Sequence, residues 1–271
     1  METLDPAERA RASPERPLIE LRNLHKRFAR LVVLSGVNLT IRAGESIVVI
    51  GASGSGKSVL LKHIVGLLKP DRGQVWFDGI RIDEAPEREL MKIRERFGFL
   101  FQMGALFDSL NVADNVGFPL VEHTQLSPED IRERVHQKLS MVGLPNIGNK
   151  MPGELSGGQR KRVALARAIA LNPEVMLYDE PTTGLDPIRA DVINELILKL
   201  KRELNVTSIV VTHDMASAFK VGDRIVMLHE GKIIFDGTPA EVQQSTDPII
   251  RRFVTGEASD EELATLGPSP T

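Results

Sequence analysis

The chain contains no cysteine, and it has only one tryptophan and one tyrosine among its 271 residues. Without cysteine it can form neither disulfides nor thiolate metal sites, which agrees with a reducing compartment. No stretch approaches the ~18 to 20 consecutive apolar residues that a membrane-spanning helix needs. The start, METLDPAERARASPERP, has neither the basic region nor the apolar core of a signal peptide. These absences predict a chain that stays in the cytoplasm.

An excess of positive charge is also absent, because 34 Lys and Arg residues are outnumbered by 37 Asp and Glu residues, for a net charge of −3. Proteins that bind nucleic acid normally present a basic face or stripe. We therefore expect no nucleic-acid partner, and we interpret the local basic runs as solvated helix faces.

The length and a hydrophobic content of 42% suit one large domain or two closely packed subdomains. Residues 1–17 are rich in charge, alanine and proline and are predicted to be a disordered tail. The folded domain is expected over residues 18–245, with a C-terminal extension over residues 246–271. From Thr255 onward the composition is typical of a mobile tail.

Two kinds of strand pattern follow one another along the chain. Residues 18–28 and 31–41 alternate apolar and polar side chains, which predicts a half-buried antiparallel sheet. The segments SIVVI, VMLYDE and TSIVVTHD, which start at Ser46, Val175 and Thr207, are instead continuously apolar and then end in polar residues. They predict a parallel α/β core, whose functional groups belong at the carboxyl ends of the strands.

A helical insertion into this core is predicted over about residues 103–160. There SPEDIRERVHQKLSMVGL has the pattern of an amphipathic helix that begins after a capping residue, Ser127. Further along, residues 224–239 are predicted to form a hairpin that turns at Glu230 and Gly231, with a short helix after it.

The first site motif is GASGSGKS, which fits G-x-x-x-x-G-K-[ST] directly after a buried strand and before the helical run VLLKHIVGLL. Glycines let the backbone wrap around phosphates, and the helix N-terminus offers partial positive charge. We expect Lys57 to reach the β- and γ-phosphates and Ser58 to bind Mg²⁺. The predicted nucleotide-binding residues are Gly51, Ala52, Ser53, Gly54, Ser55, Gly56, Lys57, Ser58 and Val59.

Acidic and polar groups at the other strand ends complete a nucleoside triphosphate site. We predict that Asp179 holds Mg²⁺, directly or through water, and that Glu180 orients the attacking water. His213 ends the strand VTHD and is predicted to contact the γ-phosphate. Gln102 lies where the α/β core gives way to the insertion. Its residue type and position favour equally a sensor of Mg²⁺ and water and an ordinary surface residue.

The run LSGGQRKR predicts a second anion site, because a capping hydroxyl and free backbone N–H groups meet at a helix start. A nucleotide that is bound at the P-loop helix has no obvious need for a second helix N-terminus from the same chain. Two chains related by a two-fold axis would each offer this site to the partner's ATP. The alternative on local physics is an ordinary cap followed by a solvated basic face. The residues concerned are Ser156, Gly157, Gly158 and Gln159.

Taken together and in order, these motifs and the GLD that ends at Asp186 resemble the ATP-binding-cassette (ABC) ATPases over residues 18 to about 237. The resemblance implies a P-loop NTPase fold with a RecA-like parallel core, an antiparallel β subdomain and a helical insertion subdomain. It implies that Phe28 stacks on adenine, that Asp186 communicates between two sites, and that Gln102 joins Ser58 and Asp179 as a metal ligand. Glu180, His213 and Gln102 are then catalytic, and the chain is an ATPase that works as a homodimer.

Weaker similarities extend to the MlaF-type lipid-transport ATPases, in the elements GALF, DNV and EHT of residues 103–126 and in DPIIRRFVTG near the end. They imply phospholipid as the transported substrate, an MlaE-like permease, an MCE-domain lipid-binding protein, a small STAS-domain subunit, and a place at the cytoplasmic face of the bacterial inner membrane. The extension from Asp247 either contacts the other protomer or such a partner, or is loose chain after Gly256.

The groove for a permease helix is expected beside Gln102. Of the apolar residues Leu106, Phe107, Val112 and Phe118, we expect half to form the insertion's own core instead. Two alternatives remain open at this point. The ATPase drives another importer, for example one for polar amino acids, or it is a non-transport cassette that acts on DNA or ribosomes, although the sequence lacks the tandem cassettes and zinc-binding cysteines typical of that class.

Overall fold

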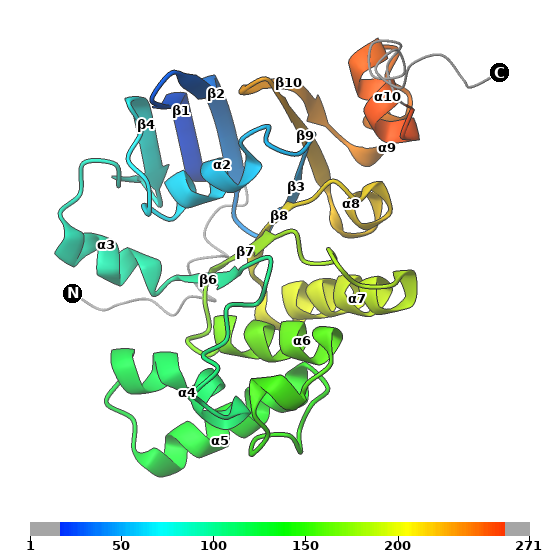
Figure 1. The fold of residues 1–271 in the computed structure, drawn as a ribbon. Coiled ribbons are helices and arrows are strands. Elements are labelled where there is room, and N and C mark those ends of the chain that lie inside the picture. Colours follow the sequence, from blue (N-terminus) through cyan, green and yellow to red (C-terminus); the bar gives the residue numbers. More distant parts are fainter. Residues whose placement is uncertain (1–16, 258–271) are drawn as a thin grey trace.

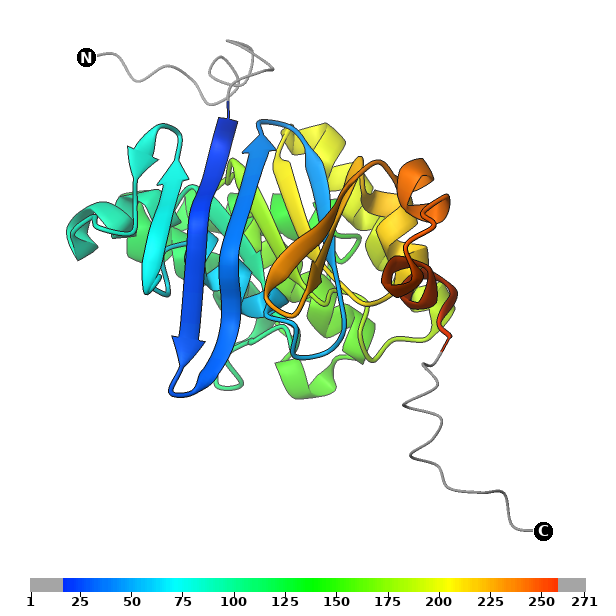
Figure 2. The ribbon, with the colours of Figure 1, turned by 90° about the horizontal axis from the view of Figure 1, so that it is seen from above.

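Two β-sheets, with helix α2 between them, form the framework of the chain (Figures 1 and 2). The computed structural model describes residues 17–257. The smaller sheet has four antiparallel strands in the order β2-β1-β4-β5, and the larger has six in the order β10-β9-β3-β8-β7-β6. The strands are β1 (Pro17–Phe28), β2 (Leu31–Arg42), β3 (Ser46–Ile50), β4 (Arg72–Phe77), β5 (Ile80–Arg81), β6 (Phe97–Leu100), β7 (Val175–Asp179), β8 (Thr207–Val211), β9 (Arg224–His229) and β10 (Lys232–Gly237).

The helices lie around these sheets and in a separate layer beyond α6 (Figure 1). They are α2 (Lys57–Ile64), α3 (Glu87–Arg94), α4 (Val112–His123), α5 (Pro128–Met141), α6 (Gly157–Ala168), α7 (Pro187–Leu204), α8 (Met215–Val221), α9 (Pro239–Gln243) and α10 (Pro248–Thr255), with a 3-10 turn at Pro152–Glu154. In the part of the chain that the structure describes, none of them is long and apolar enough to span a membrane.

The antiparallel sheet matches the alternating pattern of the sequence. Strands β1 and β2 pair antiparallel, with Ile19 opposite Ile41 and Leu21 opposite Leu39. All four side chains are buried, so one face of the sheet packs inward and the other faces out, as the period of two predicts. Pro17 already belongs to β1, so the strand begins one residue before the predicted start. The rest of the predicted tail lies outside the described residues.

The parallel core also follows the prediction, because every residue of β3, β7 and β8 is buried. Along β3 the side chains alternate between two hydrophobic clusters. Ile47 and Val49 pack with the residues of α2 and the antiparallel sheet, whereas Val48 and Ile50 pack with those of α6 and α7. Since successive side chains of a strand point to opposite faces, α2 and α6 cover opposite faces of the larger sheet.

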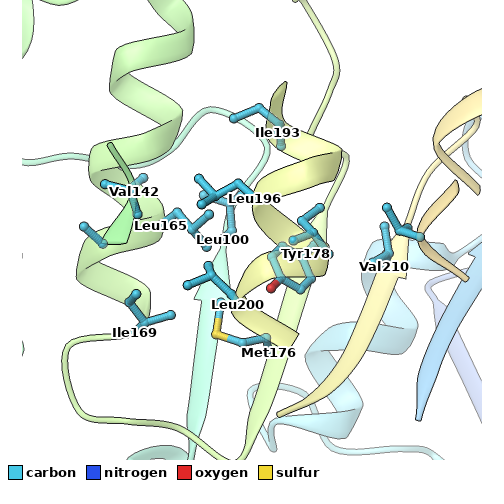
Figure 3. Close-up of a cluster of buried hydrophobic side chains, with 14 of the residues drawn as sticks. Leu100, Val142, Leu165, Ile169, Met176, Tyr178, Ile193, Leu196, Leu200 and Val210 are labelled. Carbon is cyan, nitrogen blue, oxygen red and sulfur yellow. The ribbon is translucent and has the colours of Figure 1, made fainter. Parts of the chain in front are cut away.

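Figure 3 shows the second cluster, in which α6 and α7 pack on the strands. Side chains of β6, β7 and β8 fill the space between the two helices and the sheet, and all of the labelled residues are at most 7% exposed. The labelled residues are Leu100, Val142, Leu165, Ile169, Met176, Tyr178, Ile193, Leu196, Leu200 and Val210.

The insertion consists of α4 and α5, which pack against α6. Helix α5 begins as predicted, with the Ser127 hydroxyl accepting from the N–H of Asp130 and Pro128 in the first turn. The helix after the P-loop motif is shorter than expected. It ends at Ile64 instead of continuing to residue 68, because Gly66 adopts a left-handed φ of 68° and the N–H groups of Leu67 and Leu68 turn back to the carbonyl of Lys62.

The predicted C-terminal hairpin is confirmed. Strands β9 and β10 pair antiparallel, and the turn residues Glu230 and Gly231 have φ values of 46° and 73°. Two consecutive left-handed residues form the turn type that matches the twist of a two-residue hairpin. Helix α9 follows behind a capping box of Thr238 and Glu241. The predicted mobile tail falls largely on residues 258–271, outside the described part of the chain.

Truncation of Leu165 should destabilise the fold strongly, because its side chain is fully buried between α6 and the sheet. We expect Leu165→Ala to lower the free energy of unfolding by about 2–5 kcal/mol, through lost burial and the cavity that remains. Ile188→Ala is the matched control, since Ile188 is 78% exposed and surface changes usually stay within about 0.5 kcal/mol. Urea denaturation of both variants checks this; similar losses would contradict the assigned core.

Candidate nucleotide-binding site

The loop between β3 and α2 has a backbone that only glycine tolerates at key points. Gly51 has a φ of 152°, and a Cβ atom there would lie 2.2 Å from the carbonyl oxygen of Leu228. Gly56 is the N-cap of α2, with a φ of 102°, and a Cβ there would lie 2.9 Å from the carbonyl oxygen of Val33. The loop is therefore pressed against β9 and β2, and it turns its backbone into the start of a helix.

The loop has the properties of a phosphate-binding cradle. The N-cap of α2 makes no side-chain hydrogen bond, so the first N–H groups of the helix are left for a ligand. The Ser55 hydroxyl is buried and has no hydrogen-bond partner among the described residues. Gly54 has a φ of 78°, and a Cβ atom there would meet no other atom within 4 Å. An orphaned hydroxyl, free helix N–H groups and open space together fit the oxygens of a polyphosphate.

Lys57 supplies the positive charge of this cradle. It is buried, and its Nζ donates to the carbonyl oxygens of Gly51 and Ala52 at 2.8 and 3.0 Å. The same Nζ lies 4.0 Å from Oε1 of Glu180. Burial lowers the pKa of Lys57, and the negative charges of Glu180 and Asp179 oppose that shift. The ammonium is thus held beside the loop, where phosphate oxygens can replace the carbonyl groups.

Ser58 and Asp179 meet across the end of the sheet. The hydroxyl of Ser58 donates to Oδ1 of Asp179 at 2.9 Å. Burial raises the pKa of Asp179, the Ser58 hydrogen bond opposes the rise, and the charge of Glu180 adds to it. A hydroxyl and a carboxylate at hydrogen-bond distance are the oxygen ligands that Mg²⁺ prefers when phosphates supply further ligands. The donor set therefore fits this ion.

Glu180 stands at the turn where the chain leaves β7. Its φ of 51° is left-handed, an uncommon conformation for a glutamate, and its N–H donates to the carbonyl of Val211 on β8. Its Oε2 lies 2.9 Å from Nδ1 of His213 and accepts from the hydroxyl of Thr183 at 3.1 Å. The carboxylate is thus 11% exposed and held from two sides.

Sequence reasoning missed two residues at this turn, Thr183 and Lys161. Interpreting QRKR as a solvated basic face was wrong for Lys161, which is only 8% exposed. Its Nζ donates to the carbonyl oxygens of Glu180 and Pro181 at 3.3 and 2.7 Å. Burial lowers its pKa to about 8, against the opposing charge of Glu180. The signal was in the spacing, because Lys161 lies four residues before the buried Leu165 on the same helix face.

Gln102 and the LSGGQ segment stand apart from this cluster. Gln102 is exposed at the end of β6, the neighbour of β7. Ser156 caps the start of α6, as predicted from the sequence, and the Gln159 side chain completes a capping box by accepting from the Ser156 N–H. No backbone hydrogen bond among the described residues joins this helix start to the P-loop. Since α2 and α6 cover opposite faces of the sheet, one chain does not bring its two helix N-termini onto one nucleotide.

Phe28 and Asp186 lie at the two edges of the site. Phe28 is 45% exposed at the end of β1, in the hairpin whose second strand brings Val33 against Gly56. Lys26 lies 5.6 Å from the centre of the Phe28 ring. Asp186 caps α7, accepting from the N–H of Arg189 at 3.0 Å. The aromatic ring is thus partly exposed near the loop, with Lys26 over one face, whereas Asp186 has a structural role as the cap of α7.

Comparison with known proteins agrees with this geometry. Residues 34–183 match the model of the ABC transporter family. The chain is 44% identical over 241 residues to the intermembrane phospholipid transport system ATP-binding protein MlaF of Haemophilus influenzae, covering 89% of this chain and 91% of that protein. It is 43% identical over 260 residues to TRIGALACTOSYLDIACYLGLYCEROL 3, chloroplastic, of Arabidopsis thaliana, covering 88% of this chain and 74% of that protein.

A further relative, the probable ribonucleotide transport ATP-binding protein mkl of Mycobacterium tuberculosis, is 44% identical over 238 residues. This chain spans 66% of the length of that protein, just under two thirds. Among solved structures, the dimeric ATP-binding cassette MJ0796 bound to ADP and Pi is 38% identical with a TM-score of 0.76, over 82% of this chain and 98% of that one. With the P-loop, the acidic strand end and this fold in place, the chain belongs to the ABC transporter family, as an ATP-binding cassette.

Proposed function

We propose that this chain is the ATP-hydrolysing subunit of a transporter that moves phospholipid between the inner and outer membranes of a bacterium. The relatives named for phospholipid transport and for a chloroplast glycerolipid support the substrate class. In this proposal the chain lies at the cytoplasmic face of the inner membrane, bound to an MlaE-like permease. An MCE-domain lipid-binding protein and a STAS-domain subunit complete the assembly.

The observation that carries the ATPase assignment is the arrangement of Lys57, Glu180 and His213 around the end of the parallel sheet. Lys57 and the N–H groups of the P-loop bind the β- and γ-phosphates of ATP. Glu180, held by Thr183 and His213, orients a water molecule for attack on the γ-phosphorus. Ser58 and Asp179 would hold Mg²⁺, with Gln102 proposed as a further ligand, and the ion would supply charge stabilisation for the phosphates.

The separation of α2 from α6 supports a homodimer with two shared sites. In each site one protomer offers the P-loop, and its partner offers the Ser156 hydroxyl and the N–H groups of Gly157 and Gly158. The exposed Ser156 is available for such a contact. The dimeric MJ0796 cassette has the same fold. ATP then closes the dimer, and hydrolysis with release of phosphate reopens it.

A groove of about 540 Å³ beside Gln102 offers a site for a permease helix. Of the four apolar residues singled out in the sequence, Val112 is fully buried and Leu106 packs on the core. Phe107 and Phe118 are 42% and 39% exposed and line the groove, so the expected half of the set faces outward. Arg167 holds the groove's floor by donating to the carbonyls of Gly104 and Ala105.

Removing the charge of Glu180 should stop turnover and leave binding intact. We expect Glu180→Gln to slow ATP hydrolysis roughly 10²- to 10⁴-fold, because the amide no longer attracts the proton of the attacking water, while the dissociation constant for ATP stays close to wild type. Steady-state phosphate release and equilibrium nucleotide binding measure the two effects. Glu133→Gln, an exposed residue of α5, is the control. Unchanged turnover in Glu180→Gln would refute the assignment of Glu180.

A negative charge at the start of α6 should separate nucleotide binding from dimerisation. A side chain at Gly157 meets only Leu185, at 3.9 Å from a built Cβ, so Gly157→Glu should fold and bind ATP as a monomer. Its carboxylate would repel the partner's γ-phosphate. In a Glu180→Gln background we therefore expect ATP to dimerise the parent and not the Gly157→Glu variant, as measured by light scattering after size exclusion. Equal dimer formation would contradict the shared site.

The transport partners are tested by purifying the tagged chain from membranes in mild detergent and identifying proteins and lipids by mass spectrometry. We expect a permease, an MCE protein and phospholipid. Phe107→Asp should lose the permease because it places a charge in the groove, whereas Val121→Asp, on the same segment but outside that groove, should keep it. A permease recovered without lipid would move the substrate to a nucleotide or an amino acid, and recovery of nucleic acid alone would refute transport.

A further inference from the structure

Lys161 is a buried cation for which the mechanism above has no use. It lies on α6, five residues after Ser156, and it is 8% exposed. Its Nζ donates two hydrogen bonds to the turn that follows β7, to the carbonyl oxygens of Glu180 and Pro181 at 3.3 and 2.7 Å. Burial makes an ammonium group costly in the folded state unless its donors are satisfied. An apolar side chain of the same length would avoid that cost, so the contact needs a reason.

The conformation of Glu180 provides one. Successive carbonyl groups of a strand point in opposite directions, so one ammonium group does not normally donate to two carbonyl oxygens that are neighbours along a strand. Here the left-handed φ of 51° at Glu180 turns the chain out of β7, and both carbonyl oxygens converge on Lys161. Such a conformation is strained for a residue other than glycine and persists only where its surroundings hold it.

We propose that Lys161 is a positioning residue for Glu180. By bonding both carbonyls, its ammonium holds the turn at the end of β7 and thereby fixes the direction in which the Glu180 carboxylate leaves the backbone. His213 and Thr183 hold the carboxylate itself, and Lys161 holds the main chain beneath it. The proposal rests on the proposed function insofar as Glu180 is the residue that orients the attacking water.

The location of Lys161 on α6 adds a link between the two sites of the dimer. Five helical residues span about 7.5 Å, so the start of α6, which we place on the partner's ATP, lies close to the residue that holds Glu180 of its own chain. At its other end, α6 carries Arg167, which holds Gly104 and Ala105. A movement of α6 would therefore reach the Glu180 turn through Lys161.

The test replaces Lys161 by methionine, which has a similar length and no donor. We expect Lys161→Met to lower kcat for ATP hydrolysis about 10- to 100-fold, since small misplacements of a catalytic group cost that much. KM and the dissociation constant for ATP should change less than about threefold, because Lys161 does not touch the P-loop, and effects confined to the transition state appear in kcat. Lys161→Gln is the second variant if the methionine protein is poorly folded.

A double variant distinguishes positioning from a general loss of structure. In a Glu180→Gln background, Lys161→Met should cause no further loss in single-turnover hydrolysis, because residues that act as a unit are not additive. Lys138→Met is the matched control. Lys138 is another buried lysine, 6% exposed, and donates to Oδ1 of Asn172 far from the site. The Lys138→Met variant should lose thermal stability and keep the kcat of the wild type.

The outcomes separate this inference from the proposed function. A wild-type kcat in Lys161→Met, or an equal further loss in the Glu180→Gln background, would overturn the role of Lys161 and leave the ATPase assignment intact. An equal loss of kcat in Lys138→Met would also overturn the role of Lys161, because removing any buried ammonium group would then slow hydrolysis. If Glu180→Gln alone hydrolyses ATP at the wild-type rate, the proposed role of Glu180 fails first.

Discussion

The parallel pairing of β3, β8 and β7 is the constraint on which the site depends. In this register Val49 of β3 is level with Val211 of β8, and Val211 is level with Asp179 of β7. The residues that come next in each strand or loop therefore meet at one edge of the sheet. Since all three strands are buried on both faces, none of them can slip by one residue without moving its side chains to the wrong layer. Hydrophobic packing thus sets the positions of the polar groups.

The two faces of that sheet divide the chemistry between two helices. Helix α2 packs on one face and presents the P-loop, and α6 packs on the other and presents the LSGGQ segment (Figure 1). Within one chain, the two helix starts therefore belong to different hydrophobic clusters. Sharing each nucleotide between two copies brings both helix starts to it, because a two-fold axis supplies the missing helix start from outside. The proposed dimer follows from this division.

Two buried lysines flank Glu180, and both donate to main-chain carbonyl oxygens. Lys57 bonds the P-loop and lies 4.0 Å from the Glu180 carboxylate, whereas Lys161 bonds the Glu180 main chain. Their partial burial lowers the pKa of each, and the charge of Glu180 opposes the shift in both cases. The negative charge at the end of β7 is therefore balanced from the side of the phosphate cradle and from the side of α6. The two lysines thus offset the charge of the Glu180 carboxylate, which lies next to the loop that binds phosphates.

The sequence by itself determined strands β1, β2, β3, β7 and β8, the P-loop, the capping residue of α5 and the hairpin that turns at Glu230 and Gly231, because each depends on neighbours within a few residues. It did not predict strands β4, β5 and β6. Short-range patterns also placed Asp179, Glu180 and His213 at strand ends. They did not reveal the left-handed turn at Glu180 or the buried ammonium of Lys161, and they extended the helix after the P-loop beyond Ile64. Those features depend on contacts between segments far apart in the chain: 19 residues separate Lys161 from Glu180, and packing of α6 on β7 decides where that charge goes. Only the tertiary structure showed that the Lys161 ammonium bonds the turn at Glu180, since the charge pattern of a basic run does not tell which of its side chains is covered or by what.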